Sequence, residues 1–255
     1  MATTTTNAWI DSLHRAGRLI AHRGGAHAAP ENTLPAFSAA AHRGYRWVEC
    51  DVACTADGVP VLFHDDTLER TSNGTGDLAA TSWQELQRLD AGGWFAPRFA
   101  GTRIPSLDQA LDHWANLGQH ACIELKVGAG QDPQRLGSIV AKAVRRRNAG
   151  HILISFSSSA LIAARNTAPE LPRGLILDAP WPMDWLDQVR SVDASALDPD
   201  QNLLDAQRIH DIQRAGLAAL CWTVNTTARV TELLNWGIDG VTTDAIDDVR
   251  PMHAS

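Results

Sequence analysis

The sequence predicts an α/β protein folded as one (β/α)8 TIM barrel, and three observations support this. Eight short runs rich in branched aliphatic residues follow one another along the chain, separated by segments with helical periodicity. The length of 255 residues suits a single barrel domain over residues 1–255. Charged residues stand near the ends of several strand-like runs, which is where parallel barrels carry their active groups.

The expected strands are short and hydrophobic, and the expected helices between them are long enough to be crossover connections. The strands cover 19–22, a run from Trp47, 121–126, 151–156, 174–178, 194–198, 217–224 and 237–243. The most evident helices cover 33–42, a run from Leu107, 132–147, 203–215 and 226–236. Without the return arm of a hairpin after the second strand, the parallel strands number eight.

The segment 66–104 interrupts this alternation. It holds five glycines, several aromatic residues and one short expected helix in TSWQELQRL. Long irregular connections in compact domains tend to be lids or binding loops, so we expect a small insertion after the hairpin that lies over the barrel mouth. A packed loop without substrate contact is the other interpretation.

The composition excludes several classes of protein. A hydrophobic fraction of 44% and a charged fraction of 20% are typical of a soluble globular protein. The net charge of −7 argues against a nucleic-acid-binding protein. No apolar run has the length of a signal peptide or a membrane span, so we expect a cytoplasmic protein without integral membrane contact. The sequence does not indicate an oligomeric state.

The cysteines show no spacing typical of a zinc site, and three of them lie in expected strands. A free thiol there behaves as a small hydrophobic group, so we expect no disulfides. The four are Cys50, Cys54, Cys122 and Cys221.

The hairpin after the second strand carries a group of titratable residues. Glu49 and Asp51 leave the same face of a strand because one residue separates them. A turn centred between Asp57 and Gly58 would place His64 opposite Asp51. Two adjacent carboxylates repel each other unless a cation or a shared proton compensates, which favours a divalent metal site. A solvated hairpin with one polar face is the alternative.

A third acid lies near the end of a later strand. Glu124 and Lys126 share a face, as Glu49 and Asp51 do. If that face is the barrel interior, Glu124 completes a set of three carboxylates. Such an oxygen-rich site suits Mg²⁺ or Ca²⁺ better than zinc.

The cations near these acids indicate a phosphate site. Arg23 follows the first strand, and Lys126 is one of only two lysines in the chain. An arginine, a lysine and a divalent ion together suit a tetrahedral anion. His22 and His64 would flank the phosphate as proton acceptor and proton donor. A structural ion pair between Lys126 and Glu124 is the alternative for that lysine.

These residues belong to a series of short motifs that resembles one family, the glycerophosphodiester phosphodiesterases, within the phospholipase-C-like barrel phosphodiesterases. Each motif is weak by itself, but together they occur in the family's order over almost the whole chain. They are His22-Arg23-Gly24, Pro30-Glu31-Asn32-Thr33, Glu49-x-Asp51 with Asp57-Gly58 and His64-Asp65, Glu124-x-Lys126, Ser155-Phe156, Trp222-Thr223-Val224-Asn225 and Gly240-Val241-Thr242-Thr243-Asp244.

The resemblance implies a role for each matching residue. It implies a divalent metal on Glu49, Asp51 and Glu124, an acid/base pair of His22 and His64, phosphate contacts from Arg23 and Lys126, and a glycerol pocket lined by Trp222. A buried core position is the alternative for Trp222. Asn32 is a candidate N-cap of the helix that follows, and Glu31 is a candidate for orienting a catalytic group.

The expected reaction is hydrolysis of a glycerophosphodiester to sn-glycerol 3-phosphate and an alcohol, with water or a substrate hydroxyl as the first nucleophile. One alternative is a lysophospholipase D-like or cyclising phosphodiesterase of the same superfamily, for which Trp94, Phe95 and Phe99 could form an apolar lip. A Schiff-base aldolase that uses Lys126 and a non-catalytic phosphodiester-binding barrel are further alternatives.

Overall fold

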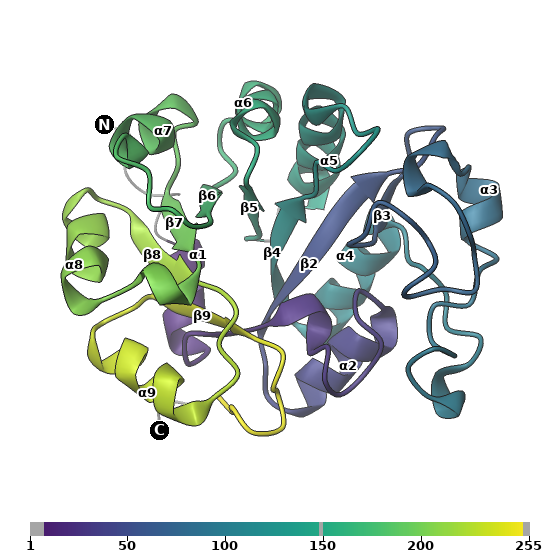
Figure 1. The fold of residues 1–255 in the computed structure, drawn as a ribbon, viewed down its shortest axis with the longest axis horizontal. Coiled ribbons are helices and arrows are strands. Elements are labelled where there is room, and N and C mark those ends of the chain that lie inside the picture. The colour runs from purple at the N-terminus through teal and green to yellow at the C-terminus, as the bar shows by residue number, and fades with distance from the viewer. Residues whose placement is uncertain (1–7, 148–149, 252–255) are drawn as a thin grey trace.

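A closed barrel of parallel strands forms the centre of the molecule (Figure 1). The computed structural model describes residues 8–147 and 150–251. The strands of the barrel are β1 (Leu19–Ala21), β2 (Trp47–Cys54), β4 (His120–Leu125), β5 (Ile152–Ser155), β6 (Arg173–Leu177), β7 (Ala196–Pro199), β8 (Ala218–Cys221) and β9 (Gly240–Thr243). Parallel pairing runs through all of them, and pairing between β1 and β2 closes the ring. The predicted (β/α)8 barrel is therefore confirmed.

Helices cover the outside of this ring, as the alternation predicts (Figure 1). They are α2 (Leu34–His42), α4 (Leu107–Leu117), α5 (Pro133–Arg147), α6 (Ser158–Thr167), α7 (Trp185–Ser191), α8 (Ala206–Arg214) and α9 (Thr227–Asn235). Four short 3₁₀ turns, η1 (His22–Gly24), η2 (Leu78–Ala80), η3 (Pro97–Phe99) and η4 (Gln201–Leu203), lie in the connections.

The strands alternate between two environments, which decides where the site can form. In β2, Val48, Cys50 and Val52 belong to the core between the sheet and the helices. Glu49 and Asp51 take the opposite face, which is the barrel interior. All four cysteines are free and buried, as expected. In the described part of the chain, no helix has both the length and the apolarity that a membrane span requires.

Helix α1 (Ala8–Arg15) was not among the predicted elements. Its Trp9 and Leu13 are buried in a hydrophobic cluster with interior residues of the barrel strands, among them Trp47. The Trp9 ring meets the Trp47 ring of β2 edge-on, with 6.2 Å between centroids. Because β2 begins at Trp47, α1 closes the end of the barrel opposite to the carboxyl ends of the strands.

The hairpin of β2 and β3 (Pro60–Leu62) corrects one prediction. Val52 pairs with Leu62, so the residue opposite Asp51 is Phe63 and not His64. The turn is longer than the expected two residues, because Thr55 N donates to Val59 O and leaves three residues between them. Since β3 ends at Leu62, the position of His64 is not set by strand alternation.

The segment 66–104 packs beside β3 and builds a small hydrophobic cluster with it, separate from the barrel core (Figure 1). It contains the expected short helix, α3 (Trp83–Leu86), which begins with a capping box between Ser82 and Glu85. The carboxylate of Asp90 accepts bonds from three backbone amides and fixes the second half of the segment.

Removal of a buried side chain from α1 tests whether this helix stabilises the barrel. Leu13 is fully buried, so Leu13→Ala should lower the free energy of unfolding by about 2–5 kcal/mol. Arg15→Ala, on the exposed face of the same helix, should change it by less than about 0.5 kcal/mol. Urea unfolding followed by circular dichroism measures both. Equal, small effects of the two changes would contradict a supporting role of α1.

Candidate active site

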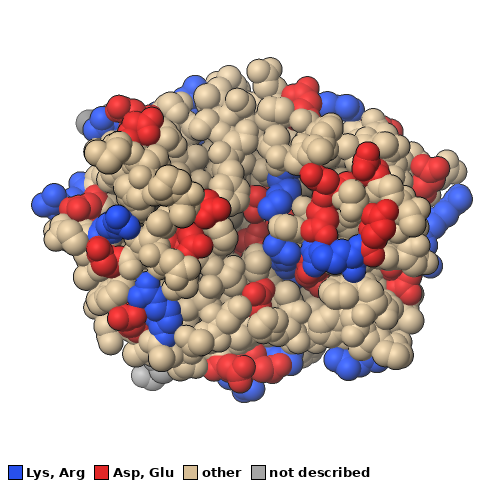
Figure 2. All heavy atoms as spheres, viewed as in Figure 1, with Lys and Arg blue, Asp and Glu red and all other residues tan. Residues whose placement is uncertain are grey.

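A cavity of roughly 280 Å³ opens at the carboxyl ends of the barrel strands. In Figure 2, acidic and basic side chains gather near the centre of the face that carries this opening. Of the predicted site residues, seven line the cavity: His22, Arg23, Glu49, His64, Glu124, Lys126 and Trp222. The eighth, Asp51, is 1% exposed and lies against them through contacts with Arg23 and Lys126.

The three predicted acids converge. Glu49, Asp51 and Glu124 each offer an oxygen, and these oxygens lie within 4.8 Å of one another. The pairing of β2 with β4 places Asp51 directly beside Glu124. All three residues are buried, and Asp51 Oδ1 has no hydrogen-bond partner. A buried group of oxygen ligands in which one oxygen accepts no hydrogen bond fits a hard divalent cation.

The pKa values of these acids reflect their crowding. Burial, together with the charges of Asp51 and Glu124, raises the pKa of Glu49 well above its usual value. Burial and the charge of Asp51 raise the pKa of Glu124 to about 7. Burial opposes ionisation of Asp51 as well, but Arg23 and Lys126 outweigh it and lower the pKa of this carboxyl.

Lys126 contacts two of the acids. Its Nζ lies 3.2 Å from Glu124 Oε1 and 3.5 Å from Asp51 Oδ1. The structure therefore contains the ion pair with Glu124 that was the alternative for this lysine. Lys126 also lines the cavity, so the pair does not remove it from reach of a bound molecule.

Arg23 is held by a turn of unusual backbone geometry. Its φ is +51°, and the two glycines that follow also have positive φ. A Cβ on Gly25 would come within 2.3 Å of Ile246, so a glycine is required there. The Arg23 amide donates to Glu49 Oε2 at 3.1 Å, and Nε lies 3.1 Å from Asp51 Oδ2. The positive φ angles and the close approach of Ile246 explain why glycines follow Arg23 in the sequence.

Asn32 orients an acid and does not cap the helix. Its Nδ2 donates to Asp51 Oδ2 at 2.8 Å, and its Oδ1 accepts from Asp51 N at 3.1 Å. The N-cap of α2 is Thr33, whose side chain makes no capping bond. Asn32 has a φ of +57°, a conformation that asparagine tolerates better than most residues. The N-cap interpretation of Asn32 is wrong.

Each of the two predicted histidines is paired with a carboxylate through Nδ1. His22 Nδ1 lies 2.7 Å from Asp244 Oδ1, and Asn225 Nδ2 donates to the other oxygen of Asp244 at 3.0 Å. His64 Nδ1 lies 2.6 Å from Asp65 Oδ1. A carboxylate at Nδ1 favours the tautomer with the proton on that nitrogen, which leaves Nε2 as the acceptor.

The surroundings of His64 also affect its protonation. Burial lowers the pKa of His64 below its usual value, and the positive charges of Arg23 and Lys126 act in the same direction. The negative charge of Asp51 opposes this shift. His64 thus lies close enough to Asp51, Arg23 and Lys126 for their charges to affect it, although it is not opposite Asp51 in the hairpin.

Arg70, from the segment 66–104, links two parts of the site and was not predicted. Its guanidinium donates to both oxygens of Glu31 at 2.8 Å and to Asp65 Oδ1 at 2.8 Å. Glu31 in turn accepts from Arg23 NH1 at 2.8 Å. The hydrogen bonds from Arg70 are the main reason that the pKa of Asp65 falls to about 2. Glu31 therefore orients Arg23, in agreement with its candidate role.

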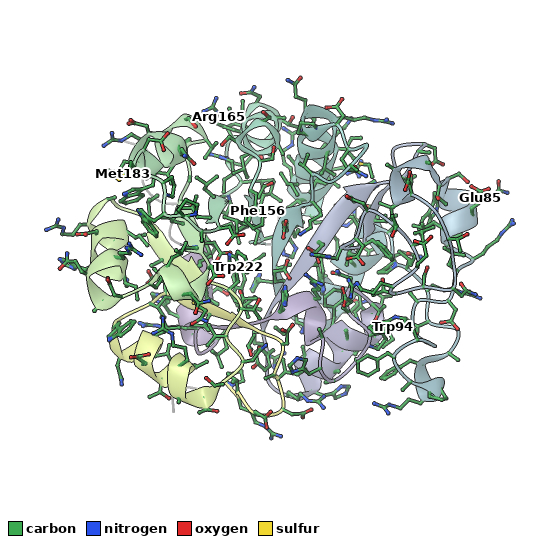
Figure 3. The ribbon with its side chains drawn as sticks, in the orientation of Figure 1. Glu85, Trp94, Phe156, Arg165, Met183 and Trp222 are labelled. Carbon is green, nitrogen blue, oxygen red and sulfur yellow. The ribbon has the colours of Figure 1, made fainter. Side chains whose placement is uncertain are left out.

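Trp222 lies in the wall of the cavity, so it is not a buried core tryptophan. Its ring meets Phe156 edge-on at 5.7 Å, and Nε1 donates to the main-chain oxygen of Asp198 at 3.0 Å. Figure 3 shows Trp222 and Phe156 close together in the centre of the molecule and Trp94 well apart from them, in the lower right of the view. None of Trp94, Phe95 and Phe99 lines this cavity.

Comparisons with known proteins show the family to which the chain belongs. The family model of the glycerophosphoryl diester phosphodiesterase family matches residues 22–248. A putative glycerophosphodiester phosphodiesterase of Bacillus subtilis is 33% identical over 90% of this chain and 95% of its own. A glycerophosphodiester phosphodiesterase of Caldanaerobacter subterraneus is 32% identical over 89% and 93%.

A solved structure is similar over the same region. It is an Oleispira antarctica phosphodiesterase in complex with the product sn-glycerol-3-phosphate, 34% identical, with a TM-score of 0.85 over 89% of this chain and 93% of that one. The resemblance found in the motifs is confirmed by the family model, by the relatives and by this fold. The chain belongs to the glycerophosphoryl diester phosphodiesterase family.

Proposed function

We propose that this protein hydrolyses glycerophosphodiesters to sn-glycerol 3-phosphate and an alcohol. The observation that carries the proposal is one cavity that joins a cluster of three buried carboxylates, two cations and two imidazoles, each imidazole paired with its own carboxylate. Membership of the family supports it, as does the related Oleispira antarctica structure with bound sn-glycerol-3-phosphate. Such a substrate has one anionic phosphoryl group and two ester arms, which suits a cavity with one charged side.

Glu49, Asp51 and Glu124 would hold a divalent cation, Mg²⁺ or Ca²⁺, because one oxygen of each converges on a common point. The three carboxylates also carry more negative charge, when ionised, than Arg23 and Lys126 can balance. Such an ion supplies Lewis-acid stabilisation of charge on phosphoryl oxygens. Arg23 and Lys126 would bind the remaining phosphoryl oxygens, because both line the cavity beside the acids.

The two histidines would move the protons. Nδ1 of each is engaged by a carboxylate, so Nε2 is the atom that accepts or donates a proton. One imidazole would accept the proton of the attacking water or substrate hydroxyl, and the other would protonate the departing alkoxide. Where the substrate hydroxyl attacks first, a cyclic phosphate forms, and water then opens it to sn-glycerol 3-phosphate. The lowered pKa of His64 favours its neutral form near pH 7, in which it can act as a base. Trp222 would contact the glycerol arm from the apolar side of the cavity.

Removal of either imidazole tests the acid/base assignment. His22→Ala and His64→Ala should each lower kcat by about 10²- to 10⁴-fold, because each removes one proton-transfer group. Release of sn-glycerol 3-phosphate from glycerophosphocholine, followed with a dehydrogenase, measures the effect. His42→Ala, on the exposed side of α2, should keep full activity. Full activity of the His22 or the His64 variant would remove the assigned roles.

Metal binding should depend on pH. The pKa of Glu124 is raised to about 7. Protons therefore compete with a cation for this carboxyl below pH 7, whereas well above pH 7 the carboxyl is ionised and free to bind the cation. Mg²⁺ or Ca²⁺ should therefore raise the melting temperature more at pH 8 than at pH 6, and EDTA should abolish activity. Glu124→Gln should lose the metal-induced shift at both pH values. An equal shift in this variant and the wild type would contradict the proposed ligand.

Arg70 should act as a positioning residue, since it holds the partners of His64 and Arg23. Arg70→Ala should lower kcat/KM by about 10- to 100-fold. Loss of its positive charge should raise the pKa of His64, so the His64-dependent limb of the pH profile should move to higher pH. Arg88→Ala, an exposed arginine of the same segment, is the matched control. An unchanged pH profile of Arg70→Ala would show that Arg70 serves the fold alone.

A further inference from the structure

Asp198, near the end of β7, is the acidic residue in the cavity for which the mechanism above has no use. It lines the cavity, is 3% exposed, and its buried Oδ1 has no hydrogen-bond partner. The other charged side chains that line this cavity are tied into contacts with one another or with Glu31, Asp65 or Asp244. Among the described cavity residues, Asp198 is thus the one carboxyl for which the structure provides no partner.

Its surroundings make this lack of a partner unfavourable. Asp198 pairs in register with Ile176 of β6, and Ile154, Phe156 and Trp222 line the same side of the cavity. A buried carboxyl among apolar side chains costs free energy unless another group bonds to it. Its neighbour Trp222 does not do so, because the indole N–H donates to the main-chain oxygen of Asp198. Besides solvent, a molecule bound in the cavity can supply that partner.

We propose that Asp198 binds a free hydroxyl of the substrate's glycerol arm and selects glycerol esters over esters without that hydroxyl. This inference rests on the proposed function, because it takes the phosphoryl group to lie beside Arg23 and Lys126. The strands that carry the acids, β2 and β4, and the strand that carries Asp198, β7, are separated in the sheet by β5 and β6. A substrate with its phosphoryl group beside Arg23 and Lys126 would therefore meet Asp198 with one of its two ester arms.

The glycerol arm fits this end of the cavity better than the second alcohol. Glycerol is the small arm common to all glycerophosphodiesters, whereas the other alcohol varies in size and needs the open side. Asp198 lies deep in the wall, while Phe156, at the same side of the cavity, is 47% exposed. The buried position therefore suits the small arm of constant shape, and the exposed aromatic side chain suits the variable one.

A hydroxyl also matches the chemistry of this carboxyl. Burial, with a contribution from Glu124, raises the pKa of Asp198 to about 8. A hydroxyl can donate to the carboxylate and accept from the carboxylic acid, so it satisfies Asp198 in either form. A cationic head group would require the charged form and would lie in the same cavity as Arg23 and Lys126, which repel it.

The test compares two ligands that differ only in hydroxyl groups. Calorimetry measures binding of sn-glycerol 3-phosphate and of n-propyl phosphate to the full-length protein saturated with Mg²⁺. Wild type should bind sn-glycerol 3-phosphate about 10- to 100-fold more tightly. Asp198→Leu should lose this preference while its affinity for n-propyl phosphate stays unchanged. Asp198→Asn should keep part of the preference, because the amide can still bond to a hydroxyl.

Controls separate binding from folding. Asp200→Asn, two residues further along the chain and outside the cavity lining, should behave as wild type. The melting temperature of Asp198→Leu should equal or exceed that of wild type, because an unpaired buried carboxyl is removed. If that variant does not fold, the same comparison with Asp198→Asn decides, and unchanged preference in it overturns the inference.

Three results would overturn the inference. They are an unchanged preference in Asp198→Leu, an equal loss of affinity for both phosphates, and a change only in the choice between glycerophosphocholine and glycerophosphoglycerol. Failure of the proposed function gives a different result, because wild type would then release no sn-glycerol 3-phosphate from any glycerophosphodiester. The binding comparison of the two phosphates would still report on Asp198 in that case.

Discussion

Mutual repulsion among three buried carboxylates is the constraint on which the rest of the site depends. Glu49, Asp51 and Glu124 lie on neighbouring parallel strands, so their charges cannot move apart without breaking the register of the barrel. Arg23 and Lys126 lie within 3.5 Å of these acids and compensate part of the charge. The part that is not compensated is what makes the cluster suited to a divalent cation.

The groups that would act on a substrate are each held by a partner from another part of the chain. Asp244, after β9, holds His22, and Arg70 from the segment 66–104 holds Asp65 and Glu31 together. The segment 66–104 contributes no residue to the cavity lining, yet it takes part in the site through Arg70. Such bonds restrict side-chain rotation, so the site is largely organised before a ligand binds.

The cavity has two unlike halves, and this follows from which strands surround it. The ends of β1, β2 and β4 supply the acids and cations, while β5 and β6 supply Ile154 and Ile176, and Phe156 and Trp222 directly follow β5 and β8. A molecule with one anionic group and two less polar arms matches this division. Asp198 is the exception in the apolar half, which is why its unpartnered carboxyl points to a polar group on one arm.

The sequence by itself determined the barrel and the shared face of the acids, because strand and helix periodicities are local properties. Alternation along β2 was enough to place Glu49 and Asp51 together in the interior. The position of His64 was reached through a wrong hairpin register, since a three-residue loop replaced the expected two-residue turn. The hydrogen bonds of Arg70 and the buried, unpartnered position of Asp198 could not be predicted, because both depend on how residues far apart in the chain are brought together. Only the tertiary structure decides such contacts, since they follow from strand order and the paths of the loops.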